Sequence, residues 1–568
     1  MTSRTRTAPA PAHESGDLPV SRPDASTVLA DPEWWRTAVI YQIYPRSFAD
    51  ANGDGMGDLA GVTARLGALQ ELGIDAIWLS PFYTSPQKDA GYDVADYCDV
   101  DPLFGTLTDF DAMVEAAHAR GIRVIVDIVP NHSSDAHPWF QAALTAAPGS
   151  AERGRYLFRD GRGTAGELPP NNWASFFGGP AWTRIVEPDG TPGQWYLHLF
   201  DSSQPDFDWT NEEVHDEFRR ILRFWLDRGV DGFRVDVASS LVKAEGLPDY
   251  HPGDDDEMPP YEGRAAVHDI FRDWRRLLDE YPGERILAAE AWIKPLARRA
   301  DWVRHDEMHQ AFNDVLNFWD ASALRASIDG ALTAFGSVGA PTAWVASNHD
   351  GIRTVTTLMF TPAERAGGVG PRTTGIPSYD QSIPRARAMA MLMLALPGSA
   401  YLYQGEELGL PEATDIPDAA RQDPTFFRTE GEQYGRDGCR VPIPWESEAP
   451  SYGFGTTDAS WLPQPEIWGR LARDRQQADP DSTLNLYRAA IALRRERGLD
   501  AGELEWLPGY AADVLAFTNA DVTVLINTGA EPVPLPAGEV LLTSTPHDFT
   551  ALTALTTLAP DTAVWIHA

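Results

Sequence analysis

Cysteine is scarce in this chain of 568 residues, where only Cys98 and Cys439 occur. Two thiols so far apart in sequence make neither a disulfide framework nor a metal-ligand spacing, which excludes a disulfide-stapled fold and a zinc module. Free thiols are typical of a reducing compartment, so the sequence predicts a cytoplasmic protein.

Basic residues are also few, because 46 Lys and Arg stand against 83 Asp and Glu, giving a net charge of −37 at pH 7. A surface with this acidic surplus repels phosphate backbones and anionic lipid at long range. We therefore expect neither nucleic acid nor a membrane among the partners of the chain.

Long hydrophobic runs are missing as well. No window reaches the eighteen apolar residues of a membrane-spanning helix, and the apolar run 388–396 fits a buried helix instead. Residues 1–30 are rich in Ala, Pro, Ser and Thr and have no apolar core of a signal peptide, so we predict a disordered tail there.

Short β-branched runs alternate with amphipathic stretches along most of the chain. This alternation predicts βα units around a parallel sheet, an α/β fold. Eight strand candidates are present, the number that closes a (β/α)8 TIM barrel. They are residues 39–44, 74–80, 122–129, 230–237, 285–289, 309–313, 342–347 and 399–404.

Two connections are too long to be simple loops. The first insertion, residues 131–205, follows strand three, and the second insertion, residues 405–479, follows strand eight. Loops after strands lie on the C-terminal face of a barrel, so both insertions are expected to wall a cleft. The predicted barrel domain spans residues 31–130 and 206–498, and alternating runs in residues 499–568 predict a C-terminal all-β domain.

Carboxylates gather at the C-terminal ends of the predicted strands, where a barrel builds its active site. Asp127, Asp236, Glu290 and Asp350 stand at or just after the ends of strands three, four, five and seven. The chain has no Ser/His/Asp order and no Gly-rich phosphate loop, so this set indicates acid/base chemistry on a neutral substrate. Glycoside hydrolysis needs a carboxylate nucleophile, a protonated acid and charge that stabilises an oxocarbenium-like transition state.

Seven short motifs in order make the sequence resemble the α-amylase family, glycoside hydrolase family thirteen, and within it the α-glucosidase and oligo-1,6-glucosidase branch. The motifs are GIDAIWLSP (73–81), DIVPNH (127–132), QPDFDW (204–209), GFRVDVA (232–238), EAW (290–292), SNHD (347–350) and GSAYLYQGEE (398–407). The resemblance covers residues 39–407 and implies a small neutral α-glucoside as substrate and no organic cofactor.

The resemblance also implies the catalytic roles. Asp236 would be the nucleophile of a covalent glucosyl-enzyme, Glu290 the general acid and then the general base, and Asp350 the group that stabilises the transition state. Arg234 precedes Asp236 by two residues in the strand and therefore points to the same face. Its fixed charge is expected to keep Asp236 ionised at neutral pH, whereas Glu290 needs a raised pKa to hold its proton.

The substrate contacts of the family imply a pocket closed at one end. His132 and His349 match histidines that bind the glucosyl unit, and Asp93 matches the aspartate that closes its non-reducing end. Arg440 resembles the arginine that pairs with this aspartate in exo-acting members, and Arg234 completes the predicted substrate-binding set. A pocket that ends at one sugar removes single glucose units, which favours an exo-glucosidase over an endo-amylase.

A separate motif, DANGDGMGD, follows the first predicted strand. The side chains of Asp50, Asn52, Asp54 and Asp58 and the carbonyl of Met56 alternate with glycines, which is the ligand spacing of a calcium loop. The glucosidase branch carries a similar loop, so we expect a structural Ca²⁺ there, away from the chemistry.

The linkage preference has two alternatives. Val237, directly after the nucleophile, resembles α-1,6-selective members, but α-1,4-linked maltose is the favoured substrate and isomaltose the alternative. A transglucosylase or trehalose synthase of the same fold is a second hypothesis, because the same three carboxylates serve both reactions. A catalytically dead carbohydrate-binding or transporter-associated relative is disfavoured, because no member of the triad is missing.

Overall fold

The computed structural model describes residues 31–251, 253, 258–313, 316–545 and 555–567. The predicted disordered tail, residues 1–30, lies outside the described residues. Within them, parallel strands close into an eight-stranded barrel in the order β1-β13-β12-β11-β10-β9-β5-β2. The strands are β1 Val39–Ile43, β2 Ala76–Leu79, β5 Arg123–Ile128, β9 Gly232–Val235, β10 Ile286–Ala289, β11 Gln310–Asn313, β12 Ala343–Val345 and β13 Ser399–Tyr403. The predicted barrel is confirmed, and each strand ends within two residues of its predicted bounds.

The register of the barrel strands positions the polar residues at its C-terminal face. Every residue of β5 and β9 is buried, as expected for strands covered on both faces. Asp127 at the end of β5 is paired in register with Arg234 of β9, and Arg234 is paired with Ala288 of β10. The side chains of Asp127 and Arg234 therefore leave neighbouring strands at the same height.

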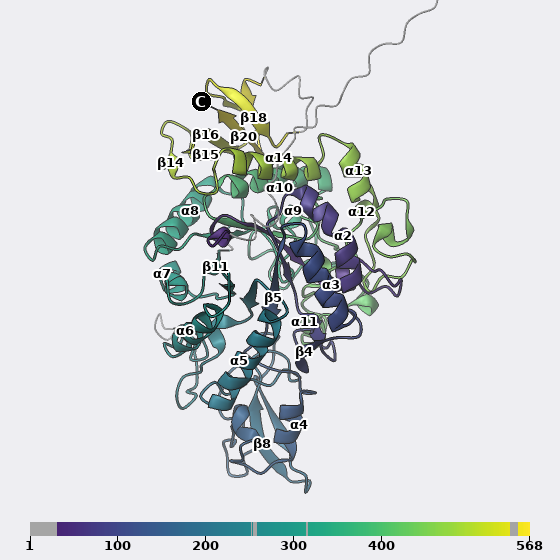
Figure 1. Ribbon diagram of the computed structural model, residues 1–568, viewed down its shortest axis with the longest axis vertical. Helices are drawn as coiled ribbons and strands as arrows, with labels where there is room; N and C mark the ends of the chain where they lie inside the picture. The colour runs from purple at the N-terminus through teal and green to yellow at the C-terminus, as the bar shows by residue number, and fades with distance from the viewer. Residues whose placement is uncertain (1–30, 252, 254–257, 314–315, 546–554, 568) are drawn as a thin grey trace, which may run out of the picture.

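Helices cover the outside of the barrel (Figure 1). In α5, the buried residues Val214, Phe218, Ile221, Leu222 and Trp225 recur at three- and four-residue intervals, which gives the helix one apolar face for the barrel. The helices between the barrel strands, apart from one inside the first insertion, are α2 Leu59–Leu72, α3 Leu107–His118, α5 Glu212–Leu226, α6 Val267–Leu278, α7 Leu296–Ala300, α8 Ala321–Gly336, α9 Thr354–Thr357 and α10 Tyr379–Ala395.

Two irregular regions rise from the C-terminal ends of the strands. After β2, the hairpin of β3 Tyr83–Thr84 and β4 Asp96–Val100 presents the loop 85–95. The first insertion carries α4 Pro138–Thr145 and a three-stranded sheet of β6 Phe158–Arg159, β8 Pro192–Leu197 and β7 Trp182–Val186, in that order, and it forms the lower end of the molecule in Figure 1.

The second insertion returns to the loop that follows β1. Phe454 accepts a hydrogen bond from the N–H of Asp50, and Trp461 donates its N–H to the carbonyl of Gly55, at 2.8 and 3.0 Å. Gly53 and Gly55 have φ of +82° and +93° and lie against Thr456 and Ala459, where a Cβ would collide. Helices in and after the insertion are α11 Pro424–Arg428, α12 Glu466–Arg470, α13 Arg473–Ala478 and α14 Thr483–Glu496.

A five-stranded antiparallel sheet completes the chain, in the order β14-β15-β16-β20-β18, and confirms the predicted C-terminal all-β domain. It packs on α10 and lies at the top of Figure 1. Its strands are β14 Leu504–Trp506, β15 Val514–Asn519, β16 Val522–Asn527, β18 Glu539–Thr543 and β20 Thr562–His567, with β17 Val533–Pro534 and β19 Thr557–Leu558 as a separate pair.

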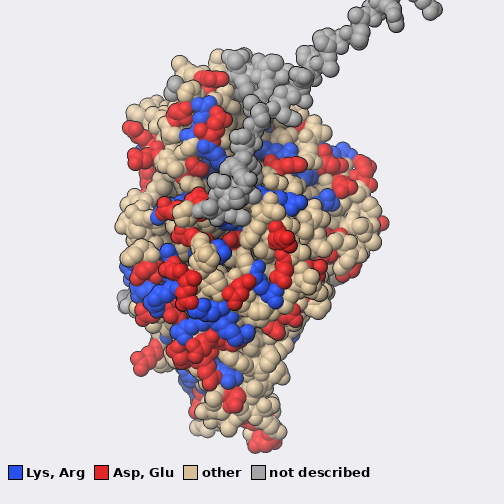
Figure 2. Space-filling model, in the orientation of Figure 1, with Lys and Arg blue, Asp and Glu red and all other residues tan. Residues whose placement is uncertain are grey.

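Acidic and basic side chains are interspersed on the face shown in Figure 2, most densely over α5 and α6. The arginines there are paired with acids, as in the Arg219–Asp273 and Arg272–Glu307 ion pairs, both at 2.6 Å. No helix among the described residues has the length and hydrophobicity needed to cross a membrane.

Candidate active site

A cavity of about 980 Å³, including the space open to solvent, lies at the C-terminal ends of the barrel strands. Its polar wall comes from the strand ends and from the loops above them, and its apolar wall includes Phe176 and Trp292, which are 49% and 45% exposed. The polar and charged lining residues are Asp89, Tyr92, His132, Asp236, Ser239, Ser240, Glu262, Glu290, Asp350 and Arg436.

One guanidinium holds three carboxylates beneath this cavity. Arg234 is buried and contacts Asp127 at 2.9 Å, Asp236 at 2.5 Å and Glu290 at 2.6 Å. Asp236 and Glu290 bind different terminal nitrogens of the same group, so the two carboxylates that the sequence pairs as nucleophile and acid are neighbours. The strand ends thus bring together the residues that the sequence predicted separately.

Burial raises the pKa of two of the three carboxylates that Arg234 contacts. It raises the pKa of Asp127 to about 7, although Arg234 opposes the rise, and Glu290 adds to it. Burial also raises the pKa of Asp236, again opposed by Arg234 and reinforced by Glu290. Arg234 therefore favours the ionised form of Asp236, as the sequence predicts, but burial and the neighbouring carboxylates outweigh its effect.

The backbone between the two carboxylates is unusual. Val237, directly after Asp236, has φ 46° and ψ 37°, the left-handed region that β-branched residues avoid. In this conformation its N–H donates to Glu290 Oε2 at 3.1 Å, and Trp292 Nε1 donates to Glu290 Oε1 at 3.2 Å. The strained turn thereby fixes Glu290 beside Asp236.

Asp350 lies next to two arginines that bind it, and its pKa is lowered, unlike the pKa values of Asp127 and Asp236. It accepts hydrogen bonds from Arg440 at 2.7 Å and from Arg436 at 3.0 Å. Burial alone would raise the pKa of Asp350, but His349, Arg436 and Arg440 outweigh burial and hold this pKa well below its usual range. Asp350 is therefore ionised throughout the neutral range.

Both predicted histidines are buried and neutral at neutral pH. Burial lowers the pKa of His132 to about 4 and lowers that of His349 well below its usual value. His349 hydrogen-bonds Tyr92 Oη through Nε2 at 2.6 Å, and Tyr92 in turn donates to Asp127 at 3.0 Å. Tyr92 also stacks on His349 with an interplanar angle of 7°. His132 lines the cavity, whereas His349 supports it from behind Tyr92.

The predicted pair of Asp93 and Arg440 is wrong. Arg440 binds Asp350, as described above, and Asp93 is fully buried and accepts three bonds from its own loop. The ion pair at the cavity wall joins Asp89 to Arg436 at 2.8 Å. Both of these residues line the cavity, and sequence reasoning missed both.

Asp93 instead builds the loop that presents Asp89. Its Oδ1 accepts the N–H of Asp89 and the hydroxyl of Ser85, and its Oδ2 accepts the N–H of Lys88, each at 2.9 Å. Three such bonds satisfy a buried carboxylate and fix the turn between β3 and β4. Asp93, which the sequence predicted as a pocket residue, therefore fixes the position of Asp89.

The two insertions meet beside the cavity. Arg436, from the second insertion, lies over the ring of Phe177 in the first at 4.9 Å and is held by the buried carboxylate of Asp423 at 2.5 Å. Arg428 of α11 donates to the carbonyl of Gly178 at 2.6 Å and pairs with Asp201 at 3.1 Å. These contacts join the two insertions next to Phe177 and Arg436, which line the cavity.

The predicted calcium loop forms a set of tight turns. Asp50 accepts the N–H groups of Gly53 and Gly55 at 2.6 and 2.8 Å, and Asp58 accepts that of Gly61 at 2.6 Å. The donor set is all oxygen, which suits Ca²⁺ in chemistry. No group of three or more acidic, His or Cys side chains in the described part of the chain gathers closely enough to hold a metal, so the calcium site stays a prediction.

Comparisons with known proteins agree with this geometry. The family described as "Alpha amylase, catalytic domain" matches residues 42–502. A probable alpha-glucosidase of Rhizobium meliloti is 37% identical over 85% of this chain and 86% of its own length. An oligo-1,6-glucosidase of Heyndrickxia coagulans is 35% identical over 81% and 85%. The crystal structure of an alpha-glucosyl transfer enzyme, XgtA, is 36% identical and superposes with a TM-score of 0.79, covering 94% of this chain and 99% of that one.

Proposed function

The chain belongs to the α-amylase family of glycoside hydrolases, and on that premise we propose that it is a retaining, exo-acting α-glucosidase. It releases the terminal non-reducing glucose of maltose and of short α-1,4-linked malto-oligosaccharides. The observation that carries this proposal is the Asp89–Arg436 ion pair, which closes one side of the cavity that contains Asp236, Glu290 and Asp350.

The first half of the reaction forms a glucosyl-enzyme. An oxygen of Asp236 attacks the anomeric carbon while Glu290 protonates the leaving glycosidic oxygen, so the C–O bond breaks and the proton moves to the aglycone. Arg234 holds both carboxylates for this step, and Asp236 gives up its negative charge as the ester forms. Asp350, held ionised by Arg436 and Arg440, faces the positive charge that develops on the sugar ring.

In the second half, Glu290 acts as a base. It removes a proton from water, the water oxygen attacks the same anomeric carbon, and Asp236 leaves as a carboxylate. Two inversions give net retention, so the released sugar is α-glucose. The neutral His132 and the Asp89–Arg436 pair would bind the hydroxyls of the glucosyl unit throughout. Four predicted substrate ligands do not line the cavity and instead hold other residues in place: Arg234, His349, Arg440 and Asp93.

Transglucosylation is the second candidate. Phe176 and Trp292 present exposed rings beside the catalytic carboxylates, and sugar rings and other acceptors stack on such faces. The alpha-glucosyl transfer enzyme among the relatives supports this candidate. The α-1,6 alternative is supported by the oligo-1,6-glucosidase relative and by Val237. A trehalose synthase reaction has no comparable support on the cavity wall.

Product analysis separates these candidates. We expect purified protein to release glucose from maltose faster than from isomaltose, with little product from sucrose or trehalose, as measured by chromatography of parallel incubations. Faster release from isomaltose would make the enzyme an oligo-1,6-glucosidase. New di- or trisaccharides that dominate at high maltose would make it a transferase, and trehalose from maltose would make it an isomerase.

We also propose that Asp50, Asn52, Asp54, Asp58 and the carbonyl of Met56 bind one structural Ca²⁺. Exhaustive chelation is expected to lower the melting temperature by a few degrees, because a ligand that binds only the folded state stabilises it by mass action. Calcium should restore the melting temperature, and kcat should change little because the loop lies outside the cavity lining. An Asp54→Asn variant with a calcium-independent melting temperature is the matched control. Identical melting of chelated and calcium-loaded wild type would contradict the site.

The proposed compartment is the cytoplasm. It rests on Cys98 and Cys439, neither of which forms a disulfide in the structure.

A further inference from the structure

A second buried carboxylate set lies behind the cavity and has no part in the mechanism above. Glu406 follows β13, is 7% exposed and does not line the catalytic cavity. Its Oε1 accepts hydrogen bonds from the hydroxyls of Ser347 and Thr354, the latter at 3.2 Å, and its Oε2 accepts the N–H of Tyr403 at 3.3 Å. Burial raises the pKa of Glu406 to about 7, with its hydrogen bonds opposing the rise.

The two hydroxyls bracket a functional turn. Ser347 follows β12 and Thr354 begins α9, and the turn 347–354 between them carries His349 and Asp350. A single oxygen atom therefore ties together both ends of the segment that presents Asp350 to the substrate. The middle of the turn is held separately, because Arg436 and Arg440 both form ion pairs with Asp350.

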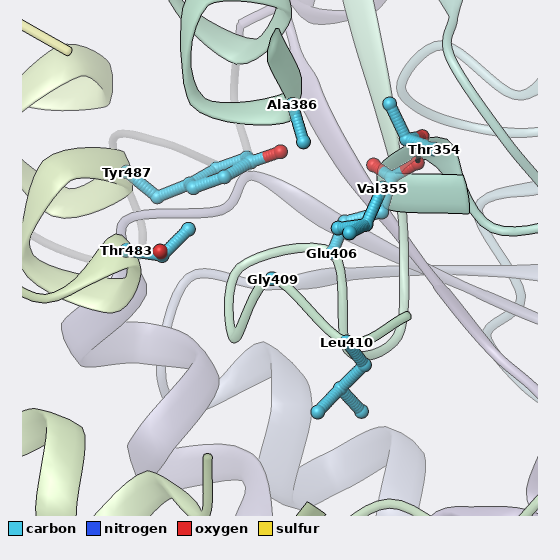
Figure 3. A pocket seen from close by; sticks show the side chains of 8 residues that line it. All are labelled: Thr354, Val355, Ala386, Glu406, Gly409, Leu410, Thr483 and Tyr487. Carbon is cyan, nitrogen blue, oxygen red and sulfur yellow. Dashed lines mark hydrogen bonds between the residues drawn. The ribbon is translucent and has the colours of Figure 1, made fainter. Parts of the chain in front are cut away.

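Figure 3 shows the surroundings of Glu406 and Thr354. Thr354 and Glu406 border a small space of about 260 Å³, a volume that includes the space open to solvent, and Tyr487 of α14 points into it from the opposite side. The lining of this space is mainly apolar.

We propose that Glu406 is a positioning residue that sets the place of Asp350 by clamping both ends of the turn 347–354. This inference rests on the proposed catalytic role of Asp350. A carboxylate acts here because one oxygen can accept two hydroxyl hydrogens while the other accepts an N–H. An amide at this position has only one acceptor oxygen, so at least one of the three bonds is lost or reversed.

The adjacent residue provides a matched control. Glu407 is also buried, but its hydrogen bonds go to Tyr41 of β1 at 2.8 Å, to Arg473 of α13 at 3.1 Å and to the N–H of Gly405 at 2.9 Å, all outside the turn 347–354. Glu406→Gln and Glu407→Gln therefore make the same chemical change at neighbouring positions. Only the first alters the support of Asp350.

The experiment compares kinetics and melting for both variants. Glu406→Gln is expected to lower kcat by about 10- to 100-fold with less change in KM, because a small displacement of a catalytic group has effects of this size. Glu407→Gln is expected to lower the melting temperature at least as much while it leaves kcat close to that of the wild type. Equal kcat values for the two variants, whether both high or both low, would overturn the proposal.

A double-mutant cycle with Asp350→Asn tests whether Glu406 acts through Asp350. We expect Glu406→Gln to cause no further loss in the Asp350→Asn background, measured with an activated aryl α-glucoside. The same loss in both backgrounds would overturn the positioning role and leave the proposed function intact. Full activity of Asp350→Asn alone would instead overturn the proposed function. If Glu406→Gln does not fold, Thr354→Val removes one of the two hydroxyls and is expected to give a smaller loss of the same kind.

Discussion

Replacing Asp236 by asparagine is expected to lower kcat for maltose and for aryl α-glucosides by about 10⁴- to 10⁶-fold, the range seen when a nucleophile is removed. Asparagine keeps the size of the side chain, and its amide oxygen can still accept a hydrogen bond from Arg234. It cannot form the ester with the anomeric carbon, so the covalent route is closed. The loss therefore reports chemistry rather than folding, and the melting temperature is expected to change little.

A control for this experiment lies on the same guanidinium. Asp127 also forms an ion pair with Arg234, at 2.9 Å, but it does not line the cavity. After incubation with a slow fluorinated α-glucoside, mass spectrometry should find one added sugar on the wild type and on Asp127→Asn, and none on Asp236→Asn. An Asp236→Asn enzyme with more than a tenth of wild-type kcat, or with the sugar label, would contradict the assignment.

The second large effect is expected at Asp89. Asp89→Asn should lower kcat/KM for maltose by about 100-fold, because a charged hydrogen-bond partner of a sugar hydroxyl is lost and Arg436 loses one of its three acidic partners. Asp93→Asn is the matched control, since Asp93 is equally buried four residues away. It should mainly lower the melting temperature, because its three bonds hold the loop, and KM should stay close to that of the wild type. The reverse pattern would restore Asp93 as the substrate ligand.

The pH dependence of KM gives an independent check on Asp89. Burial raises its pKa to about 6, although Arg436 and Arg440 oppose the rise. Asp89 is therefore ionised above pH 6 and becomes neutral below it, and its ion pair with Arg436 is lost on acidification. The KM of the wild type should rise as the pH falls below 6, and the KM of Asp89→Asn should not.

The free energy of unfolding depends on pH in the opposite sense. A carboxyl whose pKa is raised in the folded state stabilises the protein most at low pH, and this contribution of Asp89 is lost as the pH rises through 6.

Much of the scaffold is readable in the sequence because its elements are locally determined. The barrel strands are short apolar runs between amphipathic helices, and even the weak candidate 309–313 is realised as β11, Gln310–Asn313. Asp236, Glu290 and Asp350 could be found because each follows such a run, and a strand end fixes where its side chain points. The convergence of Asp127, Asp236 and Glu290 on Arg234 then follows from strand register.

The residues that sequence reasoning missed depend on contacts between distant loops. Asp89 and Arg436 are 347 positions apart, and neither follows a barrel strand directly. In the segment DAGYD, either acid could face the pocket, and only the three bonds that bury Asp93 decide that Asp89 does. The rise in the pKa of Asp236 was missed for a related reason, because the sequence does not show how completely the folded barrel buries this carboxylate beside Asp127 and Glu290.

The pairing of β1 with β13 has a consequence for synthesis. Val39 lies opposite Ala400, so the free edge of the first strand waits for a partner made about 360 residues later. At about 5–20 residues per second, that wait lasts roughly 20 to 70 seconds on the ribosome. Throughout it, an apolar strand edge is open to pairing with other nascent chains. Slower translation would lengthen this exposure of the β1 edge.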